Sequence, residues 1–357
     1  MNRPTARSAA LLIWILVGAA CDRVEGLDES DAAAAGSATG TVSEAGLPTA
    51  VPADVGMSGE RLSRIRPAMQ AYIDDGRLVG VMTMVARHGQ VVHWETVGMR
   101  DREAGDPLDP DDLFRIYSMT KPVTTVAAMI LVEEGAVALE DPVSKFIPAF
   151  ADITVLTDAG ERVAPTGPIT VEHLMTHTSG LTYGFFGDTP VDRLYNESGF
   201  FFQAVGLDDF VTRAAELPLL ANPGDLWNYS VSTNVLGRIV ELVSGQPLDG
   251  FVKARILDPL GMEDTDFWVP PEKRNRFTAN YNRADDVLQV ADSPIDGPYT
   301  EAPAWLSGGH GLVSTASDYI RFAQMLLLDG RLGDVRILEA GSVEMMRANR
   351  LPDALVP

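Results

Sequence analysis

Ser118 and Lys121 carry the chemistry that this sequence offers most directly. They lie three positions apart in the segment 116–122 (IYSMTKP), and an apolar stripe follows them as far as Gly135. This periodicity predicts a largely buried helix with Ser118 near its start. Positions i and i+3 share a helix face, so the Lys121 amine can reach the Ser118 hydroxyl. Because lysine loses its proton readily when desolvated, the pair is suited to nucleophilic catalysis by serine.

The Ser118 motif alone is also compatible with a simple helix cap. Three further blocks decide between these interpretations: HTSGL at 177–181, PGDLWNYS at 223–230 and SGGHGLVST at 307–315. Together with SMTKP at 118–122, they closely resemble the serine beta-lactamase and penicillin-binding-protein superfamily. More narrowly, they are similar to the class C-like serine hydrolases that include family VIII carboxylesterases. The resemblance covers residues 51–357, with all four blocks in the family's order.

The resemblance implies an α/β (α+β) fold, in which an antiparallel sheet flanked by helices is joined to a helical lobe. It also implies catalytic roles for Ser118 as the acylated nucleophile, Lys121 as its partner and Tyr229 as the general base. Tyrosine is a poor base at neutral pH, so this role requires a nearby cation such as Lys121 to lower its pKa. Judged alone, Tyr229 could instead be a buried aromatic ahead of a helix at 232–244. No metal or organic cofactor is implied.

Two departures from the family pattern bear on function. Class C beta-lactamases have an asparagine two residues after the tyrosine, where this chain has Val231. This difference favours ester hydrolysis over lactam hydrolysis, and we assign no such role to Asn234, which is five residues after the tyrosine. The family also has a Lys-Thr-Gly or Trp-Gly-Gly-like strand after the tyrosine, and this sequence shows none. We therefore expect a chain that is C-terminally truncated relative to the family, a fragment rather than a degenerate paralogue.

These features predict a serine hydrolase that acts by acyl-enzyme transfer, specifically a carboxylesterase on short-chain esters. Two alternatives remain open within enzymes, a beta-lactamase and a D-alanyl-D-alanine carboxypeptidase. A third alternative is a catalytically impaired binding lipoprotein of the cell envelope. The expected partner is a small ester or a beta-lactam-like molecule.

The first 21 residues have the pattern of an export signal. Arg3 and Arg7 precede an apolar run at 9–20, which is too short to span a bilayer stably. VGAAC at 17–21 resembles a bacterial lipobox, so we predict lipidation at Cys21, with an ordinary secretory signal as the alternative. Residues 22–56 are rich in small and acidic residues and predict a flexible tether, followed by the hydrolase domain at 57–357. The expected location is periplasmic or cell-envelope, with a lipid anchor.

Other elements must position this chemistry. Helical spacing from Ser58 to Gly76 precedes strand-like runs at 79–87 and 91–97, which a hairpin signal joins at 88–90. Another helix is predicted at 315–329. The paired phenylalanines at 185–186 and the triplet at 200–202 could wall an acyl pocket or lie in the core. The five histidines lack metal-site spacing, so we predict turn, surface or buried hydrogen-bonding roles for them.

Composition limits the partners. The 357 residues carry a net charge of −22, which argues against nucleic acid and against binding to anionic lipid. The single cysteine excludes an internal disulfide and a cysteine-based metal site.

Overall fold

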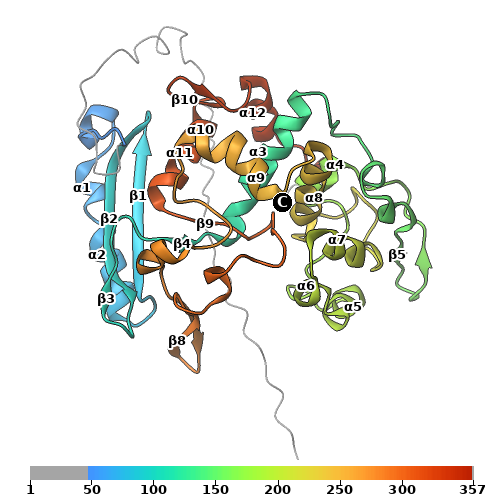
Figure 1. Cartoon of the computed structure of the whole chain (residues 1–357), viewed down its shortest axis with the longest axis horizontal. Coiled ribbons are helices and arrows are strands. Elements are labelled where there is room, and N and C mark those ends of the chain that lie inside the picture. Colours follow the sequence, from blue (N-terminus) through green and yellow to red (C-terminus); the bar gives the residue numbers. More distant parts are fainter. Residues whose placement is uncertain (1–46, 356–357) are drawn as a thin grey trace, which may run out of the picture. The chain divides into compact units, whose positions relative to one another are not determined.

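The computed structural model describes residues 47–355, and it divides the chain into two compact units. Of the described residues, one unit comprises residues 47–110 together with Asn280–Ala291. The other comprises Asp111–Ala279 and residues 292–355. Both units contain helices and strands, which Figure 1 labels.

The first unit contains the predicted hairpin. Strands β1 (Gly80–Arg87) and β2 (Gln90–Asp101) pair antiparallel, and β3 (Asp106–Pro107) pairs with the end of β2. The turn residues His88 and Gly89 have φ of 51° and 76°. Two consecutive positive φ values match the right-handed twist of the flanking strands, which explains the tight connection. The hairpin prediction is confirmed, and β2 extends four residues beyond the predicted end.

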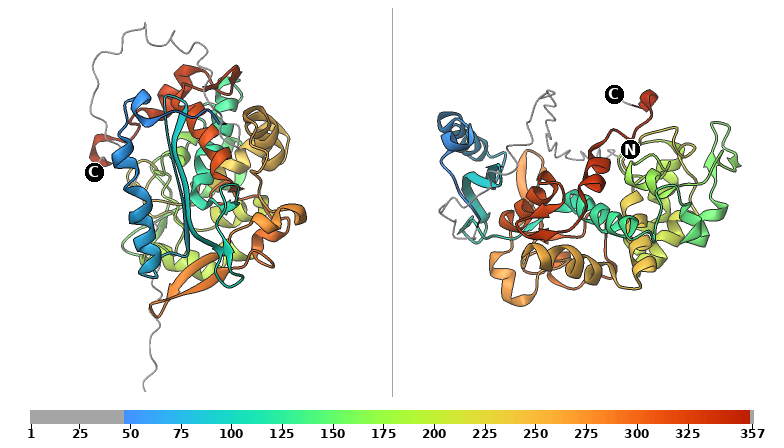
Figure 2. Two further views of the ribbon diagram at one scale, coloured as in Figure 1. Left: turned by 90° about the vertical axis from the view of Figure 1, so that its left-hand side faces the viewer. Right: turned by 90° about the horizontal axis from the view of Figure 1, so that it is seen from above.

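The helix predicted from Ser58 is present as two pieces, α1 (Gly59–Leu62) and α2 (Ile65–Asp74). The Ser58 hydroxyl accepts a hydrogen bond from the Arg61 amide and caps α1. The break falls at Ser63 and Arg64. Pro67, in the first turn of α2, has no N–H to donate to the Ser63 carbonyl oxygen, so a continuous helix would lack this hydrogen bond. Helix α2 lies along the strands of the sheet, as Figure 2 shows.

The boundary predicted for the tether is too late in the chain. Leu47 is only 2% exposed, and the backbone around Thr49 pairs with Val91 of β2. A 3-10 turn, Pro52–Val55, follows. Composition does not reveal that residues near Thr49 are ordered, because they are held by hydrogen bonds to a strand about forty residues further along the chain. Such long-range pairing leaves no pattern in the local sequence. Residues 1–46, with the predicted signal and Cys21, lie outside the described residues.

A second hairpin completes this unit. Strands β7 (Asn280–Ala284) and β8 (Val287–Asp292) are paired, and Asp285 and Asp286 turn the chain with φ of 48° and 62°. Arg283 donates a hydrogen bond to the carbonyl oxygen of Gly76, at the end of the segment containing α2.

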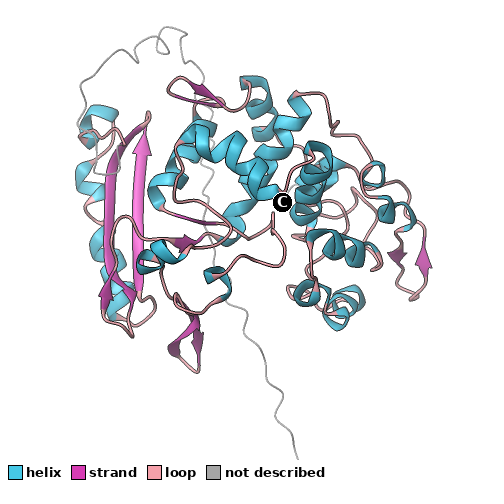
Figure 3. Ribbon diagram, viewed as in Figure 1, coloured by secondary structure: helices cyan, strands magenta, loops and turns pink. Residues whose placement is uncertain are grey.

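The second unit is mainly helical (Figure 3). Its helices are α3 (Thr120–Glu133), α4 (Val171–Met175), α5 (Pro190–Ser198), α6 (Phe200–Gln203), α7 (Leu207–Ala215), α8 (Ser232–Ser244), α9 (Leu248–Val252), α10 (Asp258–Leu260), α11 (Ala316–Leu327) and α12 (Ala340–Arg347). Short antiparallel pairs join β4 (Phe114–Arg115) to β9 (Val313–Ser314), β5 (Val155–Leu156) to β6 (Arg162–Val163), and β10 (Arg331–Leu332) to β11 (Val335–Arg336).

Helices α3 and α8 pack against each other in the core of this unit. Helix α3 is buried along most of its length, as its nearly continuous apolar sequence predicts, and Gly135 follows its end with φ of 71°. Helix α8 has the predicted bounds, and its apolar face faces inward. The two helices carry or adjoin the candidate catalytic residues, so their packing fixes the site.

Candidate active site

Ser118 lies in a 3-10 turn, Tyr117–Met119, that leads directly into α3. Tyr117 has φ of 42°, a left-handed conformation that is costly for a bulky residue and that surrounding contacts must maintain. Pro122 is accommodated because the first turn of a helix does not use its backbone donors internally. The hydroxyl of Tyr319 in α11 donates to the Met119 carbonyl oxygen at 3.0 Å and holds the turn against the helix.

Lys121 is the buried cationic partner of this serine. Its Nζ lies 3.2 Å from the Ser118 Oγ and donates to the Gly309 carbonyl oxygen at 2.8 Å. Only 8% of the residue's surface is exposed, and burial lowers its pKa to about 7. A substantial fraction of the amine is therefore neutral at physiological pH, with a lone pair available to accept a proton.

Tyr229 completes the cluster. Its Oη donates a hydrogen bond to Ser118 Oγ at 2.5 Å, and Lys121 Nζ lies 4.4 Å from the centre of its ring. The structure does not provide the lowered tyrosine pKa that a role as general base requires, because burial raises the pKa of Tyr229. The cation that should lower it is itself buried and titrates near neutrality. In this geometry, Lys121 is better suited than Tyr229 to be the resting base.

Two of the sequence blocks, HTSGL at 177–181 and PGDLWNYS at 223–230, contact each other next to Tyr229. The Asn228 side-chain amide donates to the Leu181 carbonyl oxygen at 2.9 Å, and its backbone N–H donates to the His177 carbonyl oxygen at 2.9 Å. The HTSGL segment therefore supports the backbone that presents Tyr229 to Ser118. This contact gives a physical reason for the presence of both blocks in one sequence.

His177 is part of the site, a placement that sequence reasoning missed. Its ring centre lies 4.9 Å from that of Tyr229, and its φ of 57° turns the backbone sharply. The Ser230 backbone N–H donates to His177 Nδ1 at 3.3 Å, which assigns the ring proton to Nε2. Burial and the nearby Lys121 charge lower the His177 pKa to about 3. His177 is half-buried and hydrogen-bonded, and spacing alone could not show its position beside Tyr229.

A chain of buried hydroxyl groups extends from this histidine. Ser230 Oγ lies 2.8 Å from Ser232 Oγ, which lies 2.7 Å from Ser179 Oγ. These serines are all fully buried. Buried hydroxyls need mutual hydrogen bonds, so the chain joins the start of α8 to the HTSGL segment in one arrangement.

The glycine-rich segment at 307–311 contacts Lys121 through the Gly309 carbonyl oxygen. His310 Nδ1 lies 2.7 Å from Ser307 Oγ, and its ring stacks on Phe201. Burial lowers the pKa of His310 to about 4, so its ring is neutral near pH 7. Thr124 in α3 donates to the Gly308 carbonyl oxygen at 2.8 Å. This segment is therefore fixed to the helix that carries Lys121.

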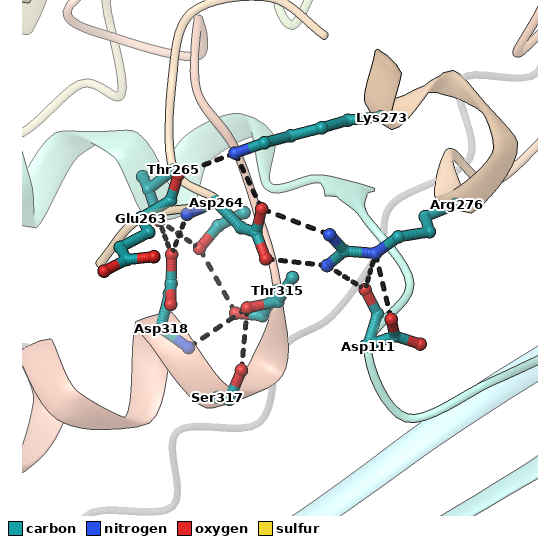
Figure 4. Close-up of polar contacts among 10 residues, drawn as sticks. Asp111, Glu263, Asp264, Thr265, Lys273, Arg276, Thr315, Ser317 and Asp318 are labelled. Atoms are coloured by element: carbon teal, nitrogen blue, oxygen red, sulfur yellow. Dashed lines mark hydrogen bonds and ion pairs between the residues drawn. The ribbon is translucent and has the colours of Figure 1, made fainter. Parts of the chain in front are cut away.

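A polar network surrounds the start of α11 (Figure 4). The same helix carries Tyr319, which contacts the turn that contains Ser118. The Thr315 hydroxyl caps α11 by accepting from the Asp318 backbone N–H at 3.1 Å. The Asp318 carboxylate accepts from the Asp264 backbone N–H at 2.8 Å and from Thr265 Oγ1 at 2.9 Å. Arg276, in turn, pairs with the Asp264 carboxylate at 2.7 Å. The network fixes a helix terminus outside the catalytic cluster.

The five phenylalanines predicted to line an acyl pocket or to lie in the core have different environments. Phe200 is 1% exposed and belongs to the core, while Phe202 is 84% exposed. Phe185 and Phe186 are partly exposed, and the Phe186 ring centre lies 6.0 Å from that of Tyr229. Phe201 packs against His310. An aromatic surface made of Phe185, Phe186 and Phe201, which we call the aromatic wall, therefore adjoins the catalytic cluster.

The described part of the chain holds no group of three histidine, cysteine, aspartate or glutamate side chains that could bind a metal. Between residues 47 and 355, no helix is long and apolar enough to cross a membrane. The predicted lipidation site, Cys21, lies outside these residues.

The sequence matches the family model described as Beta-lactamase over residues 65–354. The chain belongs to the Beta-lactamase family. Among curated proteins, it is 41% identical to Protein Rv1367c of Mycobacterium tuberculosis over 290 residues, covering 80% of this chain and 71% of the relative. It is 36% identical to Esterase EstB of Burkholderia gladioli over 292 residues, covering 77% and 71%.

Solved structures agree with this assignment. The fold is similar to that of EstCE1, a hydrolase with promiscuous acyltransferase activity, with a TM-score of 0.69 and 30% identity. The match covers 81% of this chain and 77% of EstCE1. The predicted beta-lactamase/transpeptidase-like fold is confirmed, and this member of the Beta-lactamase family is a serine hydrolase.

Proposed function

We propose that this Beta-lactamase family member is a carboxylesterase that hydrolyses short-chain esters through an acyl-enzyme at Ser118. The observation that carries the proposal is the contact of one hydroxyl with both a buried amine and a phenol: Ser118 Oγ lies 3.2 Å from Lys121 Nζ and 2.5 Å from Tyr229 Oη. The similarity to Esterase EstB and to the hydrolase EstCE1 supports an ester substrate.

In the proposed acylation step, Ser118 Oγ forms a bond to the ester carbonyl carbon while its proton passes to the neutral Lys121 amine. The carbonyl oxygen takes the negative charge, and the Ser118 backbone N–H, near the positive end of α3, is a suitable donor to it. When the intermediate collapses, the C–O bond to the alcohol breaks. The departing alkoxide takes the Tyr229 proton, which the Lys121 ammonium replaces.

In deacylation, water attacks the acyl carbon as Lys121 accepts its proton. When this second intermediate collapses, the bond between the acyl carbon and Ser118 Oγ breaks and the carboxylic acid is released. Ser118 Oγ takes the Tyr229 proton, which the Lys121 ammonium replaces. An alcohol in place of water would give acyl transfer, which is the promiscuous activity described for EstCE1. The aromatic wall provides apolar surface beside the reacting atoms for an acyl or alcohol group.

A beta-lactamase or a D-alanyl-D-alanine carboxypeptidase is the second proposal, and one observation weighs against it. Val231 is fully buried at the start of α8, so it presents no amide to a substrate amide bond. A catalytically impaired envelope lipoprotein remains a third proposal. The formed contacts among Ser118, Lys121 and Tyr229 favour an enzyme over this alternative.

The test compares hydrolysis of p-nitrophenyl butyrate and a chromogenic cephalosporin by the wild type and by Ser118→Ala. We expect hydrolysis of the ester with a burst of p-nitrophenol, and loss of about 10³-fold or more in the variant. Cephalosporin turnover faster than ester turnover would contradict the esterase assignment. A folded wild type that cleaves neither compound and takes no fluorophosphonate label at Ser118 would support the impaired lipoprotein.

A further inference from the structure

Asn234 lies in α8, one turn beyond Tyr229, and is completely buried. Its Oδ1 accepts two hydrogen bonds from the glycine-rich segment, from the Gly309 backbone N–H at 2.7 Å and from Ser307 Oγ at 2.9 Å. These bonds hold the segment from its α8 side. Asn234 therefore has a contact role that its position in the sequence did not reveal.

The same peptide segment contacts Lys121. Gly309 donates its N–H to Asn234, and its carbonyl oxygen accepts from Lys121 Nζ at 2.8 Å. A single glycine thus connects the two side chains. A Cβ at this glycine would lie 2.8 Å from Asn234 Oδ1 and 3.1 Å from Tyr183 Oη, so a larger residue would have to displace the Asn234 amide.

The orientation of the amine follows from this connection. A neutral amine has two N–H donors and one lone pair. When one N–H donates to the Gly309 carbonyl oxygen, rotation about the terminal carbon–nitrogen bond is restricted, and the lone pair can face Ser118 Oγ, 3.2 Å away. If Gly309 moved, the amine would lose this constraint.

We propose that Asn234 is a positioning residue that fixes the Gly309 carbonyl and thereby orients the Lys121 amine toward Ser118. The inference deepens the proposed function because it rests on Lys121 as the base. It does not depend on the identity of the ester.

Four other titratable groups surround Lys121, namely Tyr183, Tyr229, His177 and His310. Burial raises the pKa of both tyrosines and lowers those of the two histidines to about 3 and about 4. All four are neutral around pH 7. If the reactivity of Ser118 rises with pH near neutrality, this rise, which we call the acidic limb, therefore reports the titration of Lys121.

The experiment measures the rate at which a fluorophosphonate labels Ser118, as a function of pH, in the wild type, Asn234→Ala and Asn234→Asp. The label reacts with the nucleophile whether or not an ester is hydrolysed. If the wild type is labelled but cleaves no ester, the proposed esterase function is refuted. The labelling rates of the variants still test the inference about Asn234. Gln324→Ala is the matched control, because Gln324 is a buried amide in α11 with an unpartnered Nε2 among the described residues.

We expect Asn234→Ala to lower the labelling rate about tenfold or more even at about pH 9, where the amine is neutral in any case. Asn234→Asp retains the Oδ1 oxygen that accepts from both Ser307 and Gly309, so it should restore the rate at high pH. Its carboxylate should also favour the ammonium form and move the acidic limb upward by about one pH unit. Gln324→Ala should lower the melting temperature without moving the limb.

The proposal is overturned if folded Asn234→Ala labels within about twofold of the wild type, or if the Asn234→Asp limb coincides with that of the wild type. Absence of labelling in the wild type would also overturn it. If Asn234→Ala does not fold, the test is the pH position of the acidic limb of Asn234→Asp compared with that of the wild type.

Discussion

Lys121 differs from a surface lysine in its protonation. Burial lowers its pKa to about 7, whereas the unperturbed side chain titrates at 10.5. The desolvated ammonium loses hydration, so the neutral form is favoured. We propose that the neutral lysine, 3.2 Å from the Ser118 hydroxyl, acts as the base in the pH range where most cells operate.

This protonation predicts the pH dependence of activity. Because the neutral amine is required and its fraction rises with pH, kcat/KM should increase about tenfold per pH unit below 7 and level off above it. Lys121→Arg should reduce kcat/KM by about 10³-fold or more at every pH, since the guanidinium stays charged. Profiles with p-nitrophenyl butyrate test both statements. An acidic limb near pH 4, or an active arginine variant, would contradict the role of Lys121.

At the scale of elements, the site depends on how α3, α8 and α11 meet the loops between them. Helix α3 carries Lys121, and Tyr229 precedes α8. Tyr319 of α11 holds the turn that presents Ser118. The polar network of Figure 4 fixes the start of α11 and therefore contributes to the site without touching a substrate.

The cap of α11 gives a prediction at this scale. Thr315→Ala removes the hydroxyl that accepts from the Asp318 N–H, so it should lower the free energy of unfolding by about 1 kcal/mol. Urea denaturation measures this change. Ser317→Ala is the control, because Ser317 contacts the Thr315 hydroxyl at 2.9 Å but does not cap the helix itself. Equal stability losses in the two variants would show that the cap is not the stabilising contact.

At the scale of the whole molecule, the strong negative charge and the predicted N-terminal anchor describe the setting of the enzyme. The net charge of −22 favours solvation and disfavours approach to anionic surfaces. We propose that an acyl chain on Cys21 supplies the membrane attachment instead. The export and lipidation of this protein are proposals from the first 21 residues.

The anchor predicts where the protein partitions. Full-length protein expressed in a bacterium should enter the detergent phase of Triton X-114 and incorporate labelled palmitate. Cys21→Ser should move it to the aqueous phase, because no lipid can be attached through a thioether at serine. Hydrolase activity should be unchanged, since residues 47–355 contain the catalytic cluster. A wild type found only in the aqueous phase would favour the ordinary secretory signal.

The sequence by itself determined the elements that depend on local order. The apolar period of α3 and α8, the turn at His88 and Gly89, and the spacing of Ser118 and Lys121 are all consequences of nearby residues. Motif order was sufficient to indicate the family.

Only the tertiary structure decided the features that depend on distant neighbours. Burial sets the pKa of Lys121 and Tyr229, and burial is a property of the packed unit. Asn234 contacts Gly309 across 75 positions of sequence, and His177 reaches Ser230 across 53. Hydrogen bonds of this range leave no periodic signal, because each partner satisfies a geometry that only the folded chain creates.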